Sequence, residues 1–160
     1  LQLDQINKNI WPYLKAMIDD ARSEGVKLYV CSPYRSYNTQ KILFDRQVQK
    51  QIAAGVPESQ AEDKAATIVA RPGTSEHHTG LAADMNFTDD AFENTPMFAW
   101  LTEHCQDYGF IMRYPKDKID VTGVIYESWH YRFVGINVAK DIKSKGVTLE
   151  EYLDEKGIKN

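Results

Sequence analysis

The amino-acid sequence predicts an α+β fold: a single compact domain over residues 1–160 with a mostly antiparallel central sheet flanked by helices. Three observations predict it. The length of 160 residues is typical of one domain. Helical periodicity dominates the first part and the end of the chain, whereas short β-prone segments concentrate in the middle and later part. Helices and strands do not alternate regularly, as they would around a parallel sheet.

The first third of the chain is expected to contain two helices with a strand between them. Apolar residues recur at helical intervals from residue 3 to residue 24, and Gly25 is a suitable C-terminal stop. Residues 26–31 form a short β-prone run that ends at a Ser-Pro pair, which indicates a strand followed by a loop. Helical spacing resumes over residues 38–54 and ends at Gly55.

The middle of the chain is expected to supply most of the sheet. A proline at the start of residues 57–69 suits the first turn of a further helix. Residues 71–74, with the sequence Arg-Pro-Gly-Thr, must form a loop. Strands are expected at residues 81–87, 110–114 and 123–134, with a polar turn at 116–120.

Two later helices carry capping signals. Thr95 is a suitable N-cap for a helix over residues 96–109, because a proline follows at the first helical position. The C-terminal piece is also helical. Thr148 and Glu151 have the spacing of a capping box, in which each residue satisfies a backbone N–H group of the other.

Composition and charge argue against several classes of partner. A net charge of −4 and an isoelectric point near 5.6 disfavour a nucleic-acid or anionic-membrane partner, since either requires a basic face. The sequence has no run of 18 apolar residues, so we expect no transmembrane segment. Cys31 and Cys105 fit a pair of buried thiols or a single disulfide about equally well.

Residues able to bind a metal and to transfer protons concentrate in two short segments, 75–84 and 127–130. A catalytic zinc site takes three nitrogen, sulfur or carboxylate ligands from the protein and leaves one position for water. His77, Asp84 and His130 would supply two nitrogens and one carboxylate. Asp84 stands inside an otherwise apolar strand, where an acidic side chain is costly unless it is paired or metal-bound.

The spacing of these residues is compatible with one site. A loop that ends in a strand could turn His77 and Asp84 toward the same point, and Gly80 between them permits a close approach or a positive φ. Glu127 precedes His130 by three residues. We therefore expect the Glu127 carboxylate to act as the general base for a water molecule at the metal.

Ordinary explanations also exist for each of these residues. A single His or Asp is usually a surface or capping residue, and both Asp84 and Glu127 could be solvated. Composition and spacing alone therefore leave a metal hydrolase as one open interpretation. His78 is the alternative to His77 as a ligand. His104 lies in a helical run without a partner at ligand spacing, which favours a surface or core position.

Two motifs give the sequence a family resemblance. Residues 75–84 read Ser-x-His-x-x-Gly-x-Ala-x-Asp, and residues 127–130 read Glu-x-Trp-His. Together they resemble the paired signatures of the VanY-type zinc D-alanyl-D-alanine carboxypeptidases, within the LAS metallopeptidases. The segment Tyr-Arg-Ser-Tyr at 34–37, with Gln40, is similar to a substrate-side stretch of that family. The resemblance covers roughly residues 30–135 and implies the Hedgehog/D,D-peptidase-like fold.

The resemblance also assigns roles to seven residues. It implies that His77, Asp84 and His130 bind one zinc ion per chain and that Glu127 is the catalytic acid and base. It also implies that Arg35 stabilises the oxyanion on the scissile carbonyl and that Gln40 and Ser75 contact the substrate. An oxyanion donor is worth about 3–4 kcal/mol in the transition state. Trp129 is expected to pack beneath the metal site.

The resemblance implies a substrate as well. This is the C-terminal D-Ala of a peptidoglycan stem pentapeptide, so the expected activity is that of a D,D-carboxypeptidase. Alternatives are an L,D-carboxypeptidase acting on tetrapeptide stems, a cell-wall endopeptidase, or a wall-binding module without chemistry. A wall substrate favours an extracytoplasmic enzyme, whose membrane anchor would lie outside this sequence, and we expect the protein to be a monomer.

Overall fold

The computed structural model describes residues 6–158, and its centre is one four-stranded antiparallel sheet. The strand order is β1–β2–β4–β3. The strands are β1 (Val30–Ser32), β2 (Ala82–Met85), β3 (Phe110–Tyr114) and β4 (Glu127–Phe133). The α-helices are α1 (Trp11–Ser23), α2 (Tyr37–Ala53), α3 (Glu58–Ala66), α4 (Pro96–His104), α5 (Ile119–Thr122), α6 (Ile136–Lys145) and α7 (Leu149–Glu155). The 3₁₀ helices are η2 (Glu76–Thr79), η3 (Asp90–Asn94) and η4 (Cys105–Tyr108). This arrangement confirms the predicted α+β class.

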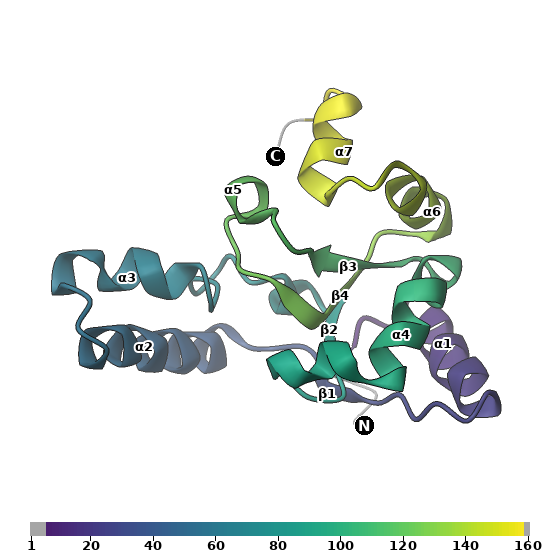
Figure 1. Cartoon of the computed structure of the whole chain (residues 1–160), viewed down its shortest axis with the longest axis horizontal. Coiled ribbons are helices and arrows are strands. Elements are labelled where there is room, and N and C mark those ends of the chain that lie inside the picture. The colour runs from purple at the N-terminus through teal and green to yellow at the C-terminus, as the bar shows by residue number, and fades with distance from the viewer. Residues whose placement is uncertain (1–5, 159–160) are drawn as a thin grey trace.

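The two faces of the sheet are covered differently. Helices α1 and α4 lie on one side of it, and α6 and α7 on the other (Figure 1). On the first side, Ala83 and Tyr131 of the sheet belong to the same buried apolar cluster as Leu14 of α1 and Leu101 of α4. Burying one such large side chain stabilises the fold by about 1.5–3 kcal/mol. The alternate residues of β2 and β4 therefore face the other side, where the candidate site lies.

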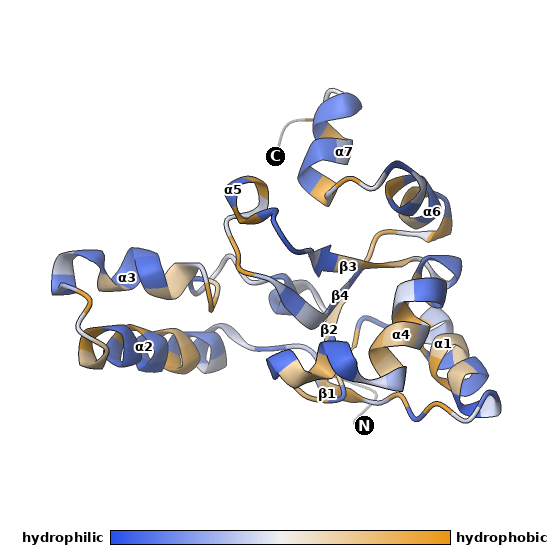
Figure 2. Ribbon diagram, viewed as in Figure 1, coloured by the Kyte–Doolittle hydropathy of each residue, from blue (hydrophilic) through white to orange (hydrophobic). Residues whose placement is uncertain are grey.

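A second and smaller apolar cluster covers part of that other face. It joins Ile111 of β3 to Ala139 and Ile142 of α6 and to Tyr152 of α7. In Figure 2, α4 is mainly hydrophobic and α7 is mainly hydrophilic, so α7 packs through few apolar side chains. The rest of the site face is left for polar residues.

Helices α2 and α3 form a hairpin that extends away from the sheet (Figure 1). Its buried apolar side chains are Phe44 of α2 and Ala61 and Ala65 of α3. Within residues 6–158, neither of the two apolar clusters includes a residue of this hairpin. The hairpin is therefore held mainly by contacts between its own two helices.

The predicted capping signals are confirmed. The Thr95 hydroxyl accepts a hydrogen bond from the backbone N–H of Phe98, at 3.2 Å, and a proline stands in the first turn of α4. Thr148 and Glu151 form the complete capping box at the start of α7. Caps of this kind are each worth about 1 kcal/mol.

Several predicted boundaries are wrong. The first helix begins at Trp11 and not at residue 3, because Pro12 fits only a first helical turn; the predicted start itself lies outside the described residues. Ile6 and Ile10 are nevertheless buried, so their spacing indicated burial without a helix. The predicted strands at 26–31, 81–87 and 123–134 are shorter, as β1, β2 and β4, and part of the predicted turn at 116–120 belongs to α5.

Two further points concern cysteines and membranes. Both cysteines are free thiols, which excludes the disulfide, but only Cys105 is buried, so the expected burial is wrong for Cys31, which is exposed. Burial raises the pKa of the Cys105 thiol to about 12. Among the described helices, none combines the length and the apolar character that a bilayer crossing requires.

Candidate active site

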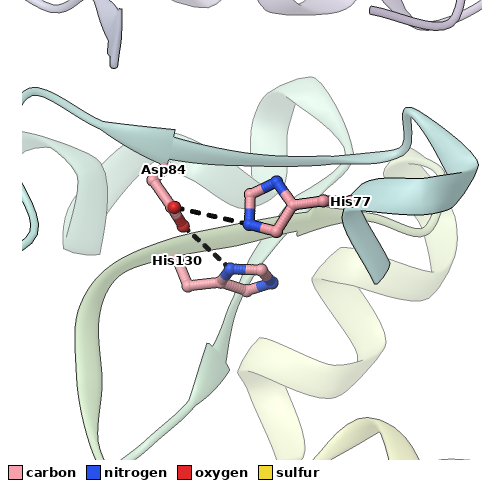
Figure 3. Close-up of side chains that lie close together, drawn as sticks. All are labelled: His77, Asp84 and His130. Carbon is pink, nitrogen blue, oxygen red and sulfur yellow. Dashed lines mark hydrogen bonds and ion pairs between the residues drawn. The ribbon is translucent and has the colours of Figure 1, made fainter. Parts of the chain in front are cut away.

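The three predicted metal ligands come together on the polar face of the sheet. One ligand atom from each of His77, Asp84 and His130 lies within 4.8 Å of the others, and all three residues are buried. Figure 3 shows both imidazole rings directed at the Asp84 carboxylate. Two nitrogens and one carboxylate oxygen are a donor set that zinc accepts. The arrangement can hold one divalent cation and leave a coordination position open.

Strand pairing explains how two of these ligands meet. Asp84 of β2 and His130 of β4 are direct partners in the antiparallel register. Side chains opposite each other in such a pair point to the same face of the sheet. His77 comes from outside the sheet, and its ring centre lies 5.0 Å from that of His130 at an interplanar angle of 79°.

His77 is held by the short helix η2, where we expected a loop. The Ser75 hydroxyl caps this helix by accepting a hydrogen bond from the His77 backbone N–H at 3.3 Å. Gly80 ends it with a φ of +67°, and a side chain there would meet the backbone nitrogen of Asn7 at 3.0 Å. Both reasons proposed for Gly80, a close approach and a positive φ, are therefore present.

The contacts of the His77 ring fix its orientation. Its Nδ1 lies 2.7 Å from the carbonyl oxygen of Pro33, so Nδ1–H donates to that oxygen. Nε2 then faces the site, 3.3 Å from Asp84 Oδ2. A carbonyl on the far nitrogen is a common way to orient a metal-binding imidazole.

His130 is fully buried between two carboxylates. Its Nδ1 lies 2.9 Å from Asp84 Oδ1, and its Nε2 lies 3.2 Å from Glu76 Oε2. Burial alone would lower the pKa of His130, but the hydrogen bonds to Asp84 and Glu76 outweigh it and raise that pKa to about 10. Burial opposes the charged form of Asp84 as well, yet its hydrogen bonds to the two histidines hold its pKa far below the usual range.

Glu127 reaches the site because β4 is irregular. In a regular strand, residues three apart point to opposite faces. Here Met112 of β3 pairs with Tyr131 of β4, and Tyr114 of β3 pairs with Glu127 of β4. Between these two pairs β4 contains more residues than β3, so β4 bulges there. Glu127 Oε2 thereby lies 3.9 Å from His130 Nδ1. Burial raises the pKa of Glu127 to about 7, which suits a group that takes up and releases a proton near neutral pH.

Arg35 lies directly beside the predicted ligands. Its Nη2 donates to Asp84 Oδ2 at 3.1 Å and lies 3.1 Å from His77 Nε2. The same nitrogen donates to Ser32 Oγ at 2.8 Å, and Nη1 donates to Gln40 Oε1 at 2.9 Å. Gln40 is completely buried, and its amide nitrogen donates to the carbonyl of Ala70 at 2.7 Å. In this structure Gln40 orients Arg35.

One cleft of about 500 Å³ is lined by all seven predicted site residues. The hairpin helix α2 supplies part of its wall, including Arg46 and Lys50. Trp129 also lines the cleft and packs against the main apolar cluster, in agreement with its expected position. The contacts of Gln40 and Ser75 with a substrate stay predictions.

The other two histidines lie outside the metal site. His78 is engaged at both ring nitrogens, because Nδ1–H donates to the Arg35 carbonyl at 2.7 Å and Nε2 accepts from the Gly73 N–H at 3.1 Å. His104 packs on Trp100 in α4, with ring centres 4.7 Å apart. His77 is therefore the histidine of the pair that can bind a metal.

The sequence interpretation missed the role of Glu76. This residue precedes a predicted ligand, yet its side chain is only 13% exposed and contacts His130. The available signal was indirect: Arg113 and Arg132 stand in strand segments next to apolar residues, and buried arginines need carboxylate partners. Glu76 is that partner for both, with oxygen–nitrogen distances of 2.8 and 3.1 Å.

Comparison with known proteins agrees with this geometry. Residues 3–136 match the VanY family, described as D-alanyl-D-alanine carboxypeptidase. A D-alanyl-D-alanine carboxypeptidase of Enterococcus faecalis is 44% identical over 151 residues, which are 94% of this chain and 56% of that protein. The chain thus spans a little over half the length of this curated relative.

Solved structures are similar as well. A VanY D,D-pentapeptidase variant from a VanB-type vancomycin resistance cassette, in complex with Zn(II), is 44% identical with a TM-score of 0.85, covering 96% of this chain and 86% of that one. The LdcB LD-carboxypeptidase is 41% identical with a TM-score of 0.82, covering 96% of this chain and 70% of that one. The match to the family extends over both motifs and most of the chain. The protein therefore belongs to the VanY family of D-alanyl-D-alanine carboxypeptidases.

Proposed function

We propose that this protein is a zinc-dependent D,D-carboxypeptidase that removes the C-terminal D-Ala from peptidoglycan stem pentapeptides. The observation that carries the proposal is the meeting of His77, Asp84 and His130 within 4.8 Å, with the largely buried Glu127 beside them in one cleft. These three residues would hold the zinc ion. A zinc ion bound there would act as a Lewis acid and would lower the pKa of a bound water molecule to about 7.

Glu127 would move the proton in this reaction. Its carboxylate accepts a proton from the attacking water and then donates it to the leaving amine of D-Ala. Burial raises the pKa of Glu127 above its ordinary value, toward the range in which a carboxyl both takes up and releases a proton. Its Oε2 lies 3.9 Å from Nδ1 of the proposed ligand His130, which places the base beside the metal position.

Arg35 would stabilise the negative charge that develops on the scissile carbonyl oxygen. Its guanidinium lies beside the ligands and is held by the Gln40 amide oxygen and the Ser32 hydroxyl. A pre-oriented donor of this kind is worth about 3–4 kcal/mol in the transition state. We also propose that Ser75 and Gln40, which line the same cleft, contact the substrate peptide.

The family supports the D,D specificity. The E. faecalis relative is named a D-alanyl-D-alanine carboxypeptidase, and the similar VanY structure is a D,D-pentapeptidase that binds Zn(II). Similarity to the LdcB LD-carboxypeptidase, at 41% identity, favours a second candidate in which the same residues act on tetrapeptide stems. A wall endopeptidase is the least supported alternative.

Defined muropeptides would test the proposal. The zinc-loaded protein is incubated with a stem pentapeptide, the tetrapeptide and a cross-linked dimer, and the products are identified by mass spectrometry. We expect release of D-Ala from the pentapeptide. Product from the tetrapeptide alone would assign L,D activity, cleavage of the dimer alone would assign an endopeptidase, and no product from any substrate would refute a wall peptidase.

We also propose that residues 1–160 form one catalytic domain and that the protein is a monomer. It acts outside the cytoplasmic membrane in this proposal, because its proposed substrate lies there. Light scattering during gel filtration would test the monomeric state, with a mass near 18.3 kDa expected for this chain.

A further inference from the structure

We propose that Glu76 is a positioning residue for the metal site: it holds His130 in the orientation and tautomer that offer Nδ1 to the metal. The inference deepens the proposed function and rests on the proposed zinc site. It assigns a task to a carboxylate that is only 13% exposed and that the proposed reaction leaves unused.

The contacts of Glu76 point in two directions. Its Oε2 lies 3.2 Å from His130 Nε2. Its Oε1 accepts from Arg113 Nε at 2.8 Å and lies 3.1 Å from Arg132 Nη1. One carboxylate oxygen is thus engaged by the ligand and the other by two arginines. The arginines fix the carboxylate in place, so that it can fix the imidazole in turn.

The two ligand histidines are oriented through opposite ring nitrogens. His77 donates from Nδ1–H to the Pro33 carbonyl, which leaves Nε2 for the site. His130 faces Glu76 with Nε2 and faces Asp84 with Nδ1. A carboxylate on Nε2 keeps the proton on that nitrogen, and the lone pair of Nδ1 then becomes available to a cation. His77 needs only a backbone carbonyl, whereas His130 depends on a charged side chain.

The support of Glu76 continues to the C-terminal helix. Arg113 of β3 is 10% exposed, and its two terminal nitrogens donate to both Glu150 oxygens at 2.9 and 2.5 Å. Glu150 lies in the first turn of α7, whose start is fixed by the capping box. Contacts therefore run from His130 of β4 through Glu76 of η2 and Arg113 of β3 to Glu150 of α7.

A purely structural role is the alternative, since buried ion pairs often contribute little net stability. The two roles differ in what they predict for metal binding. Removal of a purely structural ion pair would lower the stability of the metal-free protein and leave zinc affinity unchanged. Removal of a positioning residue would change zinc affinity and the state of the His130 ring, because carboxylates behind a ligand typically affect metal affinity about 10–100-fold.

The test compares variants of the full chain for zinc affinity, measured by competition with a chromogenic chelator. We expect Glu76→Gln to weaken zinc binding about 10–100-fold. Glu150→Gln, which removes only the second layer of support, should have a smaller effect. Glu62→Gln is the matched control, because Glu62 pairs with Arg71 at 2.9 Å on the surface and contacts none of the ligands. It should bind zinc as the unmodified protein does.

A measurement without mutation keeps the proposal falsifiable if Glu76→Gln does not fold. Nitrogen-15 NMR of the zinc-loaded, histidine-labelled protein should show His130 with a proton on Nε2 and the metal on Nδ1. Metal on Nε2, or unchanged zinc affinity in a folded Glu76→Gln variant, would overturn the inference. Zinc binding with the expected NMR pattern but no release of D-Ala would instead refute the proposed function and leave the role of Glu76 standing.

Discussion

The site face of the sheet and the α2–α3 hairpin are stabilised in different ways. Around the site, charged groups hold one another: Glu76, Asp84 and His130 are joined by hydrogen bonds, Asp84 and His130 are buried, and the Glu76 side chain is only 13% exposed. The hairpin buries only Phe44 and two alanines as apolar residues, and its ion pairs, such as Lys41–Asp45, lie on the surface. Surface pairs of this kind contribute about 0–1 kcal/mol.

This difference indicates a division of tasks. The residues proposed to carry the reaction lie on or against a sheet that is packed on both sides, which keeps them pre-oriented. The hairpin supplies one wall of the cleft through α2 and extends away from the rest of the molecule. Apart from Gln40, which orients Arg35, residues of the hairpin should therefore affect substrate affinity, whereas residues on or against the sheet should affect the chemical step.

The largest effect is expected from the proposed base. Glu127→Gln keeps the size of the side chain but cannot accept the proton, so kcat for release of D-Ala should fall by about 10²–10⁴. Zinc content, measured by atomic absorption, should stay at one ion per chain. An exposed control on the hairpin, Glu58→Gln, should keep full activity. Full activity in Glu127→Gln would remove Glu127 from the reaction.

Arg35 should come next. Arg35→Lys keeps the positive charge but loses the planar pair of donors, so kcat should fall by about 10²–10³ while the zinc content is retained. Arg22→Lys on α1, where the arginine pairs with Asp19 on the surface, serves as the control. A rise in KM at unchanged kcat would contradict the oxyanion role and would assign Arg35 to ground-state binding.

The hairpin should respond separately from the sheet. Phe44→Ala removes its largest buried side chain, and truncations of this type cost about 3–5 kcal/mol in a closed core. We expect faster hydrogen exchange in α2 and α3, unchanged protection in β2 and β4, and a higher KM. The control is Ile42→Ala, because Ile42 is 53% exposed on the same helix. Equal loss of protection in the sheet would show that the two regions unfold as one unit.

The smallest expected effect is a change in the pKa of Glu127 when zinc binds. Burial raises the pKa of Glu127 to about 7 in the metal-free protein. A divalent cation nearby favours the ionised carboxylate, so zinc should lower this pKa by about 1 unit or more. In the metal-free protein the carboxyl is therefore protonated below pH 7 and ionised above it, and the zinc-loaded protein ionises at lower pH. Carbon-13 NMR titration of both forms would measure the difference, and identical titration curves would contradict it.

Local sequence patterns could predict the caps and the two motifs that contain the candidate site residues. The caps at Thr95 and Thr148 and the motifs at 75–84 and 127–130 are short-range signals, because a motif or a cap depends on residues only a few positions apart. The fold class followed from the order of periodic segments. These features need no knowledge of which strands pair.

The features that could not be predicted depend on pairing between distant segments. Glu127 would face away from the ligands in a regular strand, and only the bulge of β4 against β3 brings it into the cleft. The role of Glu76 depends on Arg113 and Arg132, which come from two different strands. The start of α1 differs from these two cases because its signal is local: Pro12 lacks an N–H and fits only the first turn of a helix, a constraint that the predicted start at residue 3 does not respect.

The cross-strand pairing of Asp84 with His130 has a consequence for quality control of the folded protein. A slip of β2 by one residue along β4 would send the two side chains to opposite faces of the sheet, because side chains alternate along a strand. A misaligned chain would then lose the chelating pair even if it stayed compact. Uptake of one zinc ion thus reports correct strand alignment, and a metal-affinity step could separate correctly folded molecules from misfolded ones before any substrate is available.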